Sequence, residues 1–296
     1  MSGFRNLDAN VRNEKLLNAA AEGQLSRLEW LIAAGANIDH EDDNGHTALH
    51  KAAIKNDEGC LKALLENGAN INARCKEGTT ALYYAVQNSN YPMVNFLLSR
   101  QATVNIALQL ASEKGDGVMV ELLVLRDKGA INAKNRNGST ALIFAAFEGH
   151  VAVVELLLLH GADTGAVNND GSTALMLAAL KGHAAVIEVL LRQEVDIEVK
   201  NNKGWTALLH AADRGRTNLV EILLRNGAAV DARSNDGSTG LMRAARGGHE
   251  ATIKVLLDNG ADIQAKNNHD WTVLMFAKQK GHEEKLLQIL PSLSTP

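Results

Sequence analysis

Residues 135–150 read NRNGSTALIFAAFEGH, and residues 151–163 continue as VAVVELLLLHGAD. The Asn-Gly pair predicts a tight turn, because glycine adopts positive φ at little cost. Thr140 is a good helix-capping residue, and alanines and leucines follow it at helical spacing. Gly149 ends this helix, and a second, longer helix with an apolar stripe is predicted from about Val151. We therefore expect a turn, a short helix, a turn, a longer helix and an extended loop.

The same pattern returns along the chain with a fixed period. Neighbouring turns are 33 residues apart, except for one step of 60 residues, six fewer than two periods. The turn position is occupied in order by Gly45, Gly78, Gly138, Gly171, Gly204, Gly237 and Asp270. A period of this size indicates a stack of small units, each of which buries its apolar face only against its neighbours.

The pattern G-x-T-A-L-x-x-A-A-x-x-G-H, followed by V-V-x-L-L-L-x-x-G-A-D, resembles the ankyrin repeat over roughly residues 13 to 290. The resemblance implies an α-solenoid, a stack of helix pairs with β-hairpin fingers that is capped at both ends. It also implies a concave face lined by the fingers and the first helices. Ala stands at most positions where the family usually carries Pro, and it keeps the start of the first helix.

We expect nine repeats in a single domain over residues 13–290, between tails at 1–12 and 291–296. The repeats are predicted to start near residues 13, 42, 75, 105, 135, 168, 201, 234 and 267. The fourth repeat has no turn before Ile106, and two extra residues near Leu125 lengthen its second helix or the exit from it. This irregular copy is either a tolerated deletion or a hinge between two halves of the array.

Composition and charge exclude several classes of function. The net charge of −4 gives no general attraction to nucleic acid or to anionic membranes, and the apolar runs are too short to span a bilayer. Two cysteines, Cys60 and Cys75, make no disulfide framework and favour a reducing compartment. The N-terminal stretch lacks the apolar core of a secretory signal. We therefore expect a cytoplasmic monomer that neither inserts into a membrane nor binds nucleic acid.

No group of residues predicts a catalytic, cofactor or metal site. A structural role in ending helices explains the histidines that share one Gly-His position, which are His150, His183, His249 and His282. The two cysteines lack the spacing of metal ligands, and single turn glycines form no phosphate-binding loop. We predict a protein that is not an enzyme. The alternative is an enzyme or small-ligand protein that uses His210 and its neighbours.

Exposed positions on the finger turns and first helices are the candidate binding residues. Trp205 and Trp271 stand where the other copies carry Ser, Thr or His, and an exposed Trp beside Arg is typical of interface anchors. The alternative is that both tryptophans only pack over adjacent turns. The register of His210 also accepts Lys and Arg, so we expect it to lie near the groove. The predicted partner-binding residues are Trp205, Trp271, Arg214, Arg243, Arg246, His210, Phe147, Tyr84, Lys51 and His46.

The resemblance to ankyrin repeats implies a non-enzymatic scaffold or adaptor that holds one protein partner along its concave face. A few aromatic and Arg anchors would carry most of the affinity. The alternative is a regulatory or effector protein that docks on an enzyme and modulates it. If the source is an intracellular bacterium, that enzyme and the place of action belong to the cytoplasm of a host cell.

Overall fold

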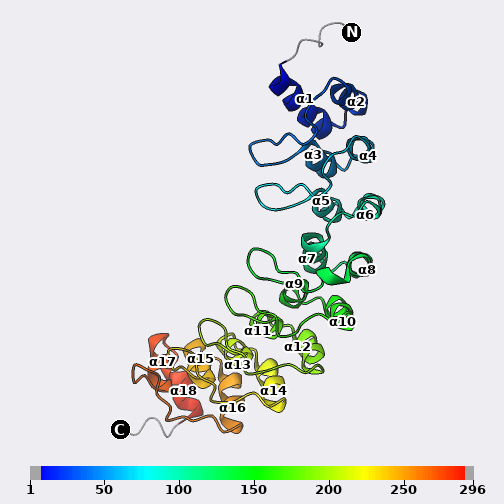
Figure 1. Cartoon of the computed structure of the whole chain (residues 1–296). Coiled ribbons are helices and arrows are strands. Elements are labelled where there is room, and N and C mark those ends of the chain that lie inside the picture. The colour runs from blue at the N-terminus through cyan, green and yellow to red at the C-terminus, as the bar shows by residue number, and fades with distance from the viewer. Residues whose placement is uncertain (1–7, 291–296) are drawn as a thin grey trace. The chain divides into compact units, whose positions relative to one another are not determined.

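The computed structural model describes residues 8–290 (Figure 1). The contacts between residues divide this chain into two compact units. Unit 1 holds the described residues up to Ala111 together with Val118–Ala130, and unit 2 holds Ser112–Gly117 and the described residues from Ile131 onward. The division falls within the fourth repeat, the copy for which the sequence predicts no finger.

Unit 1 is built from pairs of short helices. Its elements, with α7 and α8 crossing its boundary, are α1 (Ala9–Glu22), α2 (Leu25–Ala33), α3 (Ala48–Lys55), α4 (Glu58–Glu66), α5 (Ala81–Gln87), α6 (Tyr91–Ser99), α7 (Asn105–Lys114), α8 (Gly117–Arg126) and the 3₁₀ turn η1 (Lys128–Ala130). The first helices α1, α3 and α5 pack side by side, and α2 and α4 form a second layer against them (Figure 1). The predicted helix pairs are therefore confirmed in this unit.

Unit 2 repeats the arrangement with five further pairs. Its helices are α9 (Ala141–Glu148), α10 (Val151–Leu159), α11 (Ala174–Lys181), α12 (Ala184–Leu191), α13 (Ala207–Asp213), α14 (Thr217–Arg225), α15 (Gly240–Gly247), α16 (Glu250–Asp258), α17 (Val273–Gln279) and α18 (Glu283–Ile289). The odd-numbered helices pack in one row and the even-numbered helices in another. The fingers project beside the row of first helices (Figure 1).

The fifth repeat shows why these residues form these elements. The Thr140 hydroxyl accepts a hydrogen bond from the backbone N–H of Ile143 at 3.4 Å and caps α9. Gly149 ends the helix in the left-handed conformation, with φ at 84°. Ala145 and Ala146 are fully buried, and their small side chains let the neighbouring helices approach closely.

The fingers are tight turns. In the sixth repeat the N–H of Asn168 bonds the carbonyl of Ser172 at 3.1 Å, and the N–H of Gly171 bonds the carbonyl of Asn168 at 2.9 Å. These two bonds close a turn but make no ladder, so the part of the chain that the structure describes contains helices and no β-strand. The predicted β-hairpin is present as its turn alone. The predicted α-solenoid of helix pairs is confirmed.

The first helix begins earlier than the sequence predicts. The Asp8 carboxylate accepts a hydrogen bond from the N–H of Asn10 at 2.7 Å, so α1 starts at Ala9. The prediction of a tail over residues 1–12 is therefore wrong for residues 9–12, because Asp8 supplies a helix cap. Residues 1–7 of that predicted tail, and the predicted tail at 291–296, lie outside the described residues.

The fourth repeat has no finger, as its sequence predicts. Helix α6 ends at Ser99 and α7 begins at Asn105, so only residues 100–104 connect them. Its second helix, α8, has 10 residues and runs into η1, which accounts for the extra length near Leu125. The interpretation of this copy as a hinge stays a hypothesis, and so does a single domain over residues 13–290.

Candidate partner-binding surface

Trp205 lies directly after the finger turn of the seventh repeat and is half-buried. Its backbone N–H donates to the side-chain oxygen of Asn201 at 2.9 Å, which fixes the turn below the indole. The indole centroid is 4.9 Å from the ring centroid of His210, and the guanidinium carbon of Arg243 is 4.8 Å from the indole centroid. Trp205 therefore packs against its own repeat and against the next one.

Arg243 is more deeply buried than its register predicts, since only 9% of the residue is exposed. Its Nη2 donates to Oδ2 of Asp236 at 2.7 Å, and its guanidinium carbon lies 5.9 Å from the centroid of Phe276. A carboxylate and two aromatic faces here replace the water that an exposed guanidinium would bind. The expectation that a register accepting Arg stays near the surface therefore fails at Arg243.

Asp236 is ionised at neutral pH and balances the charge of Arg243. Burial raises the pKa of Asp236, but hydrogen bonds from the Ser234 hydroxyl at 2.5 Å and the Ser238 N–H at 3.2 Å lower it, as does the charge of Arg243. The net result is a pKa of about 2. The Arg243–Asp236 pair therefore presents little net charge to a partner.

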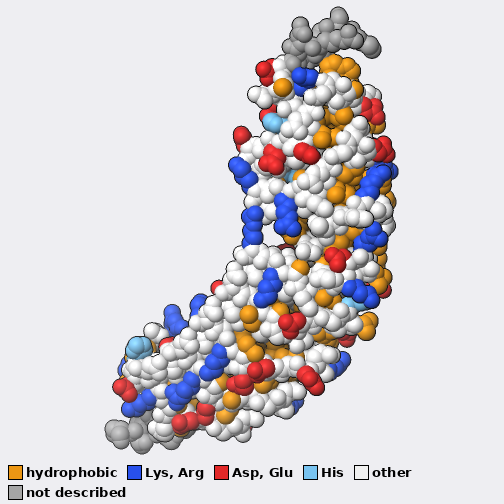
Figure 2. Space-filling view, viewed as in Figure 1, with side chains coloured by type: hydrophobic (Ala, Val, Ile, Leu, Met, Phe, Trp, Pro, Cys, Tyr) orange, Lys and Arg blue, Asp and Glu red, His pale blue; other side chains and the backbone are white. Residues whose placement is uncertain are grey.

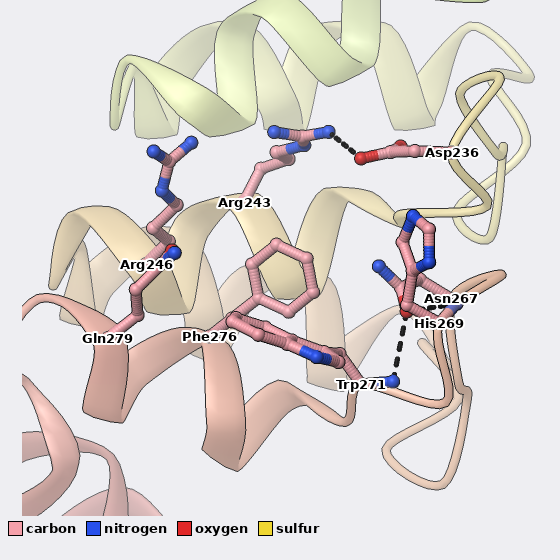
Figure 3. Close-up of a pocket in the computed structure, with 8 residues that line it drawn as sticks. All are labelled: Asp236, Arg243, Arg246, Asn267, His269, Trp271, Phe276 and Gln279. Atoms are coloured by element: carbon pink, nitrogen blue, oxygen red, sulfur yellow. Dashed lines mark hydrogen bonds and ion pairs between the residues drawn. The ribbon is translucent and has the colours of Figure 1, made fainter.

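A recess of about 220 Å³ opens beside this ion pair in unit 2. Its lining residues, drawn in Figure 3, are Asp236, Arg243, Arg246, Asn267, His269, Trp271, Phe276 and Gln279. Trp271 is 36% exposed, and its indole meets the ring of Phe276 edge to face with the centroids 5.6 Å apart. These two rings form one wall, and Arg246 and Asp236 stand at opposite ends (Figure 3). We call this site the Trp271 recess.

Arg246 also borders a second recess, of about 360 Å³. The residues that line this second recess are Asp213, Arg246, Gly247, Lys280 and His282. Among the described residues, the buried Nε of Arg246 has no hydrogen-bond partner. Arg246 thus separates two open recesses and holds donor capacity that the protein itself does not use. On the face seen in Figure 2, Lys and Arg side chains stand at several points along the finger edge of unit 2.

His210 is held in its neutral form. Burial lowers its pKa to about 4, and the positive charges of Arg214 and Lys203 act in the same direction. Its Nδ1 is buried and has no hydrogen-bond partner within the described chain. Arg214 itself is exposed. A base with a pKa this low is too weak for proton abstraction near neutral pH, so His210 makes a poor general base.

Three of the predicted residues gather in unit 1. Nε2 of His46 lies 2.9 Å from the hydroxyl of Tyr84, and Nζ of Lys51 lies 2.6 Å from Oδ2 of Asp42. Burial raises the pKa of Asp42, but the hydrogen bond from Lys51 and two backbone N–H groups outweigh burial, and the pKa falls to about 2. The Thr79 hydroxyl also bonds Tyr84, at 3.0 Å. Of these contacts, the one between His46 and Tyr84 joins the second repeat to the third.

Phe147 belongs to unit 2 but not to the stack around Trp205. The Nζ of Lys181 lies over its ring, 4.1 Å from the centroid.

The structure thus brings Trp205, His210 and Arg243 into contact and places Arg246 and Trp271 around one recess. The interpretation of the tryptophans as residues that pack over adjacent turns fits Trp205 better than it fits the more exposed Trp271.

The structure reveals a ladder of asparagine side chains that the sequence analysis missed. Each Nδ2 donates to a carbonyl of the preceding finger, and the pairs are Asn169 to Arg136 at 3.0 Å, Asn202 to Asn169 at 2.9 Å, Asn235 to Asn202 at 2.9 Å and Asn268 to Asn235 at 2.9 Å. The recurrence of Asn at 33-residue steps was the available signal. This ladder belongs to unit 2.

The histidines of the Gly-His position also join successive repeats. Their Nε2 atoms lie against carbonyls at the end of the preceding first helix, at 2.8 Å for His150 and Glu113, 3.0 Å for His183 and Phe147, and 3.1 Å for His249 and Asp213. Each of these histidines is the N-cap residue of its own second helix. The preceding glycine ends the first helix, as at Gly149, so these histidines stand at the start of the second helix and contact the preceding repeat.

The described residues do not assemble a candidate metal site. Within them, no cluster of three or more His, Cys, Asp or Glu side chains has the arrangement of a metal site. Cys60 and Cys75 are buried free thiols, and burial together with the charge of Asp57 raises the pKa of Cys60 to about 12. A membrane-crossing segment is also absent from this part of the chain, since none of its helices is both long and apolar enough.

Stacked pairs of short helices, joined by turn fingers that bond one to the next, define a helical repeat protein. A family model described as ankyrin repeats, in three copies, matches residues 16–107, 108–201, 157–234, 186–267 and 226–293. The chain belongs to the ankyrin repeat family. Ankyrin repeats are generally protein–protein interaction modules, and proteins built from them are typically not enzymes. A search among curated proteins finds no match to the chain.

Proposed function

We propose that this chain is a scaffold or adaptor that binds a protein partner on the finger side of unit 2, with Trp271 as the main anchor. The supporting observation is that Trp271 keeps 36% of its surface exposed beside the Trp271 recess. Trp205, by contrast, is engaged by His210 and Arg243. An exposed Trp next to an Arg and a recess matches the composition of interface hot spots.

Affinity capture with matched tryptophan variants tests this proposal. The full chain and its Trp271→Ala variant are used as baits in lysate of the native cell, and bound proteins are quantified by mass spectrometry. We expect the specific partner to be depleted about tenfold or more by Trp271→Ala, because hot-spot truncation costs at least that much affinity. Equal capture by both baits would remove Trp271 from the interface.

Trp30 provides the control for nonspecific adhesion. It is 40% exposed on α2 of unit 1, so Trp30→Ala removes a comparable aromatic surface from another place. We expect capture by this variant to match that of the unaltered chain. Helicity and the urea midpoint of both variants are measured first, so that loss of binding is not confused with loss of folding.

The same material tests a regulatory or effector role. If the captured partner is an enzyme, its catalytic rate is measured with and without the purified chain. A changed rate identifies a modulator, and an unchanged rate identifies a scaffold or adaptor. We also propose that the chain acts as a monomer in a reducing cytoplasm, which is supported by the burial of both free thiols, Cys60 and Cys75. Light scattering measures the molar mass of the chain in solution and so tests whether it is a monomer. Cell fractionation tests whether it lies in the cytoplasm.

A further inference from the structure

We propose that the partner segment bound at the Trp271 recess carries a carboxylate side chain next to an apolar one, with Arg246 and Lys280 receiving the carboxylate. This inference rests on the proposed function and adds the chemistry of the partner. It is carried by two observations, the unused donors of Arg246 and the sign of the charge around the two recesses.

Arg246 is free to bind an acidic group from outside. Its buried Nε has no hydrogen-bond partner among the residues that the structure describes, and the nearby carboxylate of Asp236 is already paired with Arg243 at 2.7 Å. A guanidinium presents a planar fork of donors that matches a carboxylate in a bidentate pair. The buried Nε is out of reach of solvent, so a partner carboxylate would meet the terminal Nη donors of the guanidinium.

The charge around Arg246 is locally positive on a chain whose overall charge is negative. The fully charged side chains that line the two recesses are Arg243, Arg246 and Lys280 against Asp213 and Asp236. The formal sum is +1, while the whole chain carries −4. Since Arg243 and Asp236 neutralise each other, the unpaired cations face Asp213 alone. Charge complementarity therefore favours an acidic segment over a basic one.

The rings of Trp271 and Phe276 form an apolar wall of the recess, which accounts for the apolar side chain of the proposed partner segment. Trp271 and Phe276 stand beside Arg246 around one recess, so an apolar or aromatic side chain can lie on the indole while a neighbouring Glu or Asp reaches the guanidinium (Figure 3). The volume of about 220 Å³ suits one side chain better than a whole small-molecule ligand. The occupant that fits both features is a short peptide segment.

A random peptide library displayed on phage, selected against the full chain, tests the inference directly. Enriched peptides are synthesised with a fluorescent label, and their affinity is measured by anisotropy. We expect an acidic residue beside an aromatic or aliphatic one, and replacement of Glu by Gln or Asp by Asn in the peptide should weaken binding about tenfold or more. Affinity should also fall with added salt.

Variants of the chain locate the carboxylate. Arg246→Gln should weaken the same peptides about tenfold, and Arg246→Lys should weaken them less, because it keeps the charge and loses the bidentate fork. Lys280→Gln gives a smaller loss. Arg225→Gln is the matched control, since Arg225 is an exposed arginine of unit 2 that pairs with Glu221 on α14, and it should leave affinity unchanged. Circular dichroism and urea midpoints verify that each variant is folded.

The outcomes separate this inference from the proposed function. Peptides that bind through Trp271 but carry no required acidic residue, or that ignore Arg246→Gln, overturn the carboxylate inference and leave the proposed interface standing. A library in which no peptide distinguishes the unaltered chain from Trp271→Ala overturns both.

Discussion

Neighbouring fingers of unit 2 are joined by an asparagine at every junction, whereas the corresponding junction of unit 1 has a lysine in that position. Asn235 donates its backbone N–H to Lys203 at 3.0 Å and its side chain to Asn202 at 2.9 Å. In unit 1 the backbone N–H of Lys76 makes the first bond, to Asn44 at 2.9 Å. The asparagine thus adds a second bond to the same junction without altering the turn.

In unit 1, histidine side chains next to the finger turn join neighbouring repeats. His50 is fully buried, with Nδ1 2.9 Å from the Thr47 hydroxyl and Nε2 3.2 Å from the Thr79 carbonyl of the next finger. His46 and Tyr84 add a further contact between the same two repeats. One repeat pattern therefore supports two ways of holding fingers together, at the tip in unit 2 and under the turn in unit 1.

The largest expected loss of stability comes from adding a side chain to a finger glycine that lies against the next finger. Gly204 has φ at 74°, and a Cβ there would lie 2.5 Å from the backbone N of Asn235 and still closer to its side-chain oxygen. We expect Gly204→Ala to lower the free energy of unfolding by on the order of 3 kcal/mol, from strain and a clash with backbone. Urea denaturation followed by circular dichroism measures the loss.

Gly68 of unit 1 is the matched control for this prediction. Its φ is also positive, at 89°, but no atom lies within 4 Å of an added Cβ. Gly68→Ala should therefore cost only the conformational strain, about 1 kcal/mol. Equal losses for the two variants would show that the close approach of neighbouring fingers contributes nothing.

The second prediction uses the buried histidine of the unit 2 stack. The pKa of His210 is about 4 in the folded chain and about 6.5 when unfolded. Between these values the unfolded chain binds the additional proton, so stability falls as pH falls from about 6.5 towards 4. We expect His210 to account for on the order of 2 kcal/mol of this loss.

His210→Leu removes the titrating group at a position where the sixth repeat already carries a leucine, Leu177. The variant should lose less stability than the unaltered chain between neutral pH and about pH 4, measured by urea denaturation at each pH. Because His50 titrates in both proteins, the difference between them isolates His210. Identical pH profiles would contradict the neutral, buried state of this ring.

The smallest changes in stability should come from removing one bond of the asparagine ladder in unit 2 and from introducing the equivalent asparagine in unit 1. Asn235→Ala removes an exposed side-chain bond from unit 2 and should cost about 0.5–1 kcal/mol. Lys76→Asn introduces the equivalent side chain in unit 1 and should add a few tenths of a kcal/mol. Urea midpoints measured in parallel test both. A loss on Lys76→Asn would show that the contacts of Lys76 are worth more than the added amide bond.

Features repeated within each copy were predictable from the sequence, and contacts between copies largely were not. Thr140, Gly149 and the buried pair Ala145 and Ala146 act within one repeat, where local propensity and spacing determine the structure. Arg243 was misjudged because its burial depends on partners from three different repeats, which no local pattern reports. The contacts of Arg243 with Trp205 and Phe276, and the asparagine ladder, arise only when repeats stack.

The candidate site shows the same division. Comparison of the repeats with one another indicated Trp205 and Trp271, since the other copies carry Ser, Thr or His at the same position. Their different exposure could not be read from the sequence, because it depends on whether an Arg of the following repeat lies over the indole. Arg243 lies over Trp205, whereas Trp271 meets Phe276 within its own copy.

The near-identical lengths of the ladder bonds, from 2.9 to 3.0 Å, have a consequence for how this protein can change over generations. Each finger in that run supplies an Asn side-chain amide, which donates to the preceding finger. It also supplies the backbone carbonyl that accepts the amide of the next finger. Duplication or loss of one whole 33-residue segment inside the run therefore leaves the ladder bond of each remaining junction in place. The ladder itself therefore needs no compensating point mutation when recombination lengthens or shortens the row of fingers in unit 2.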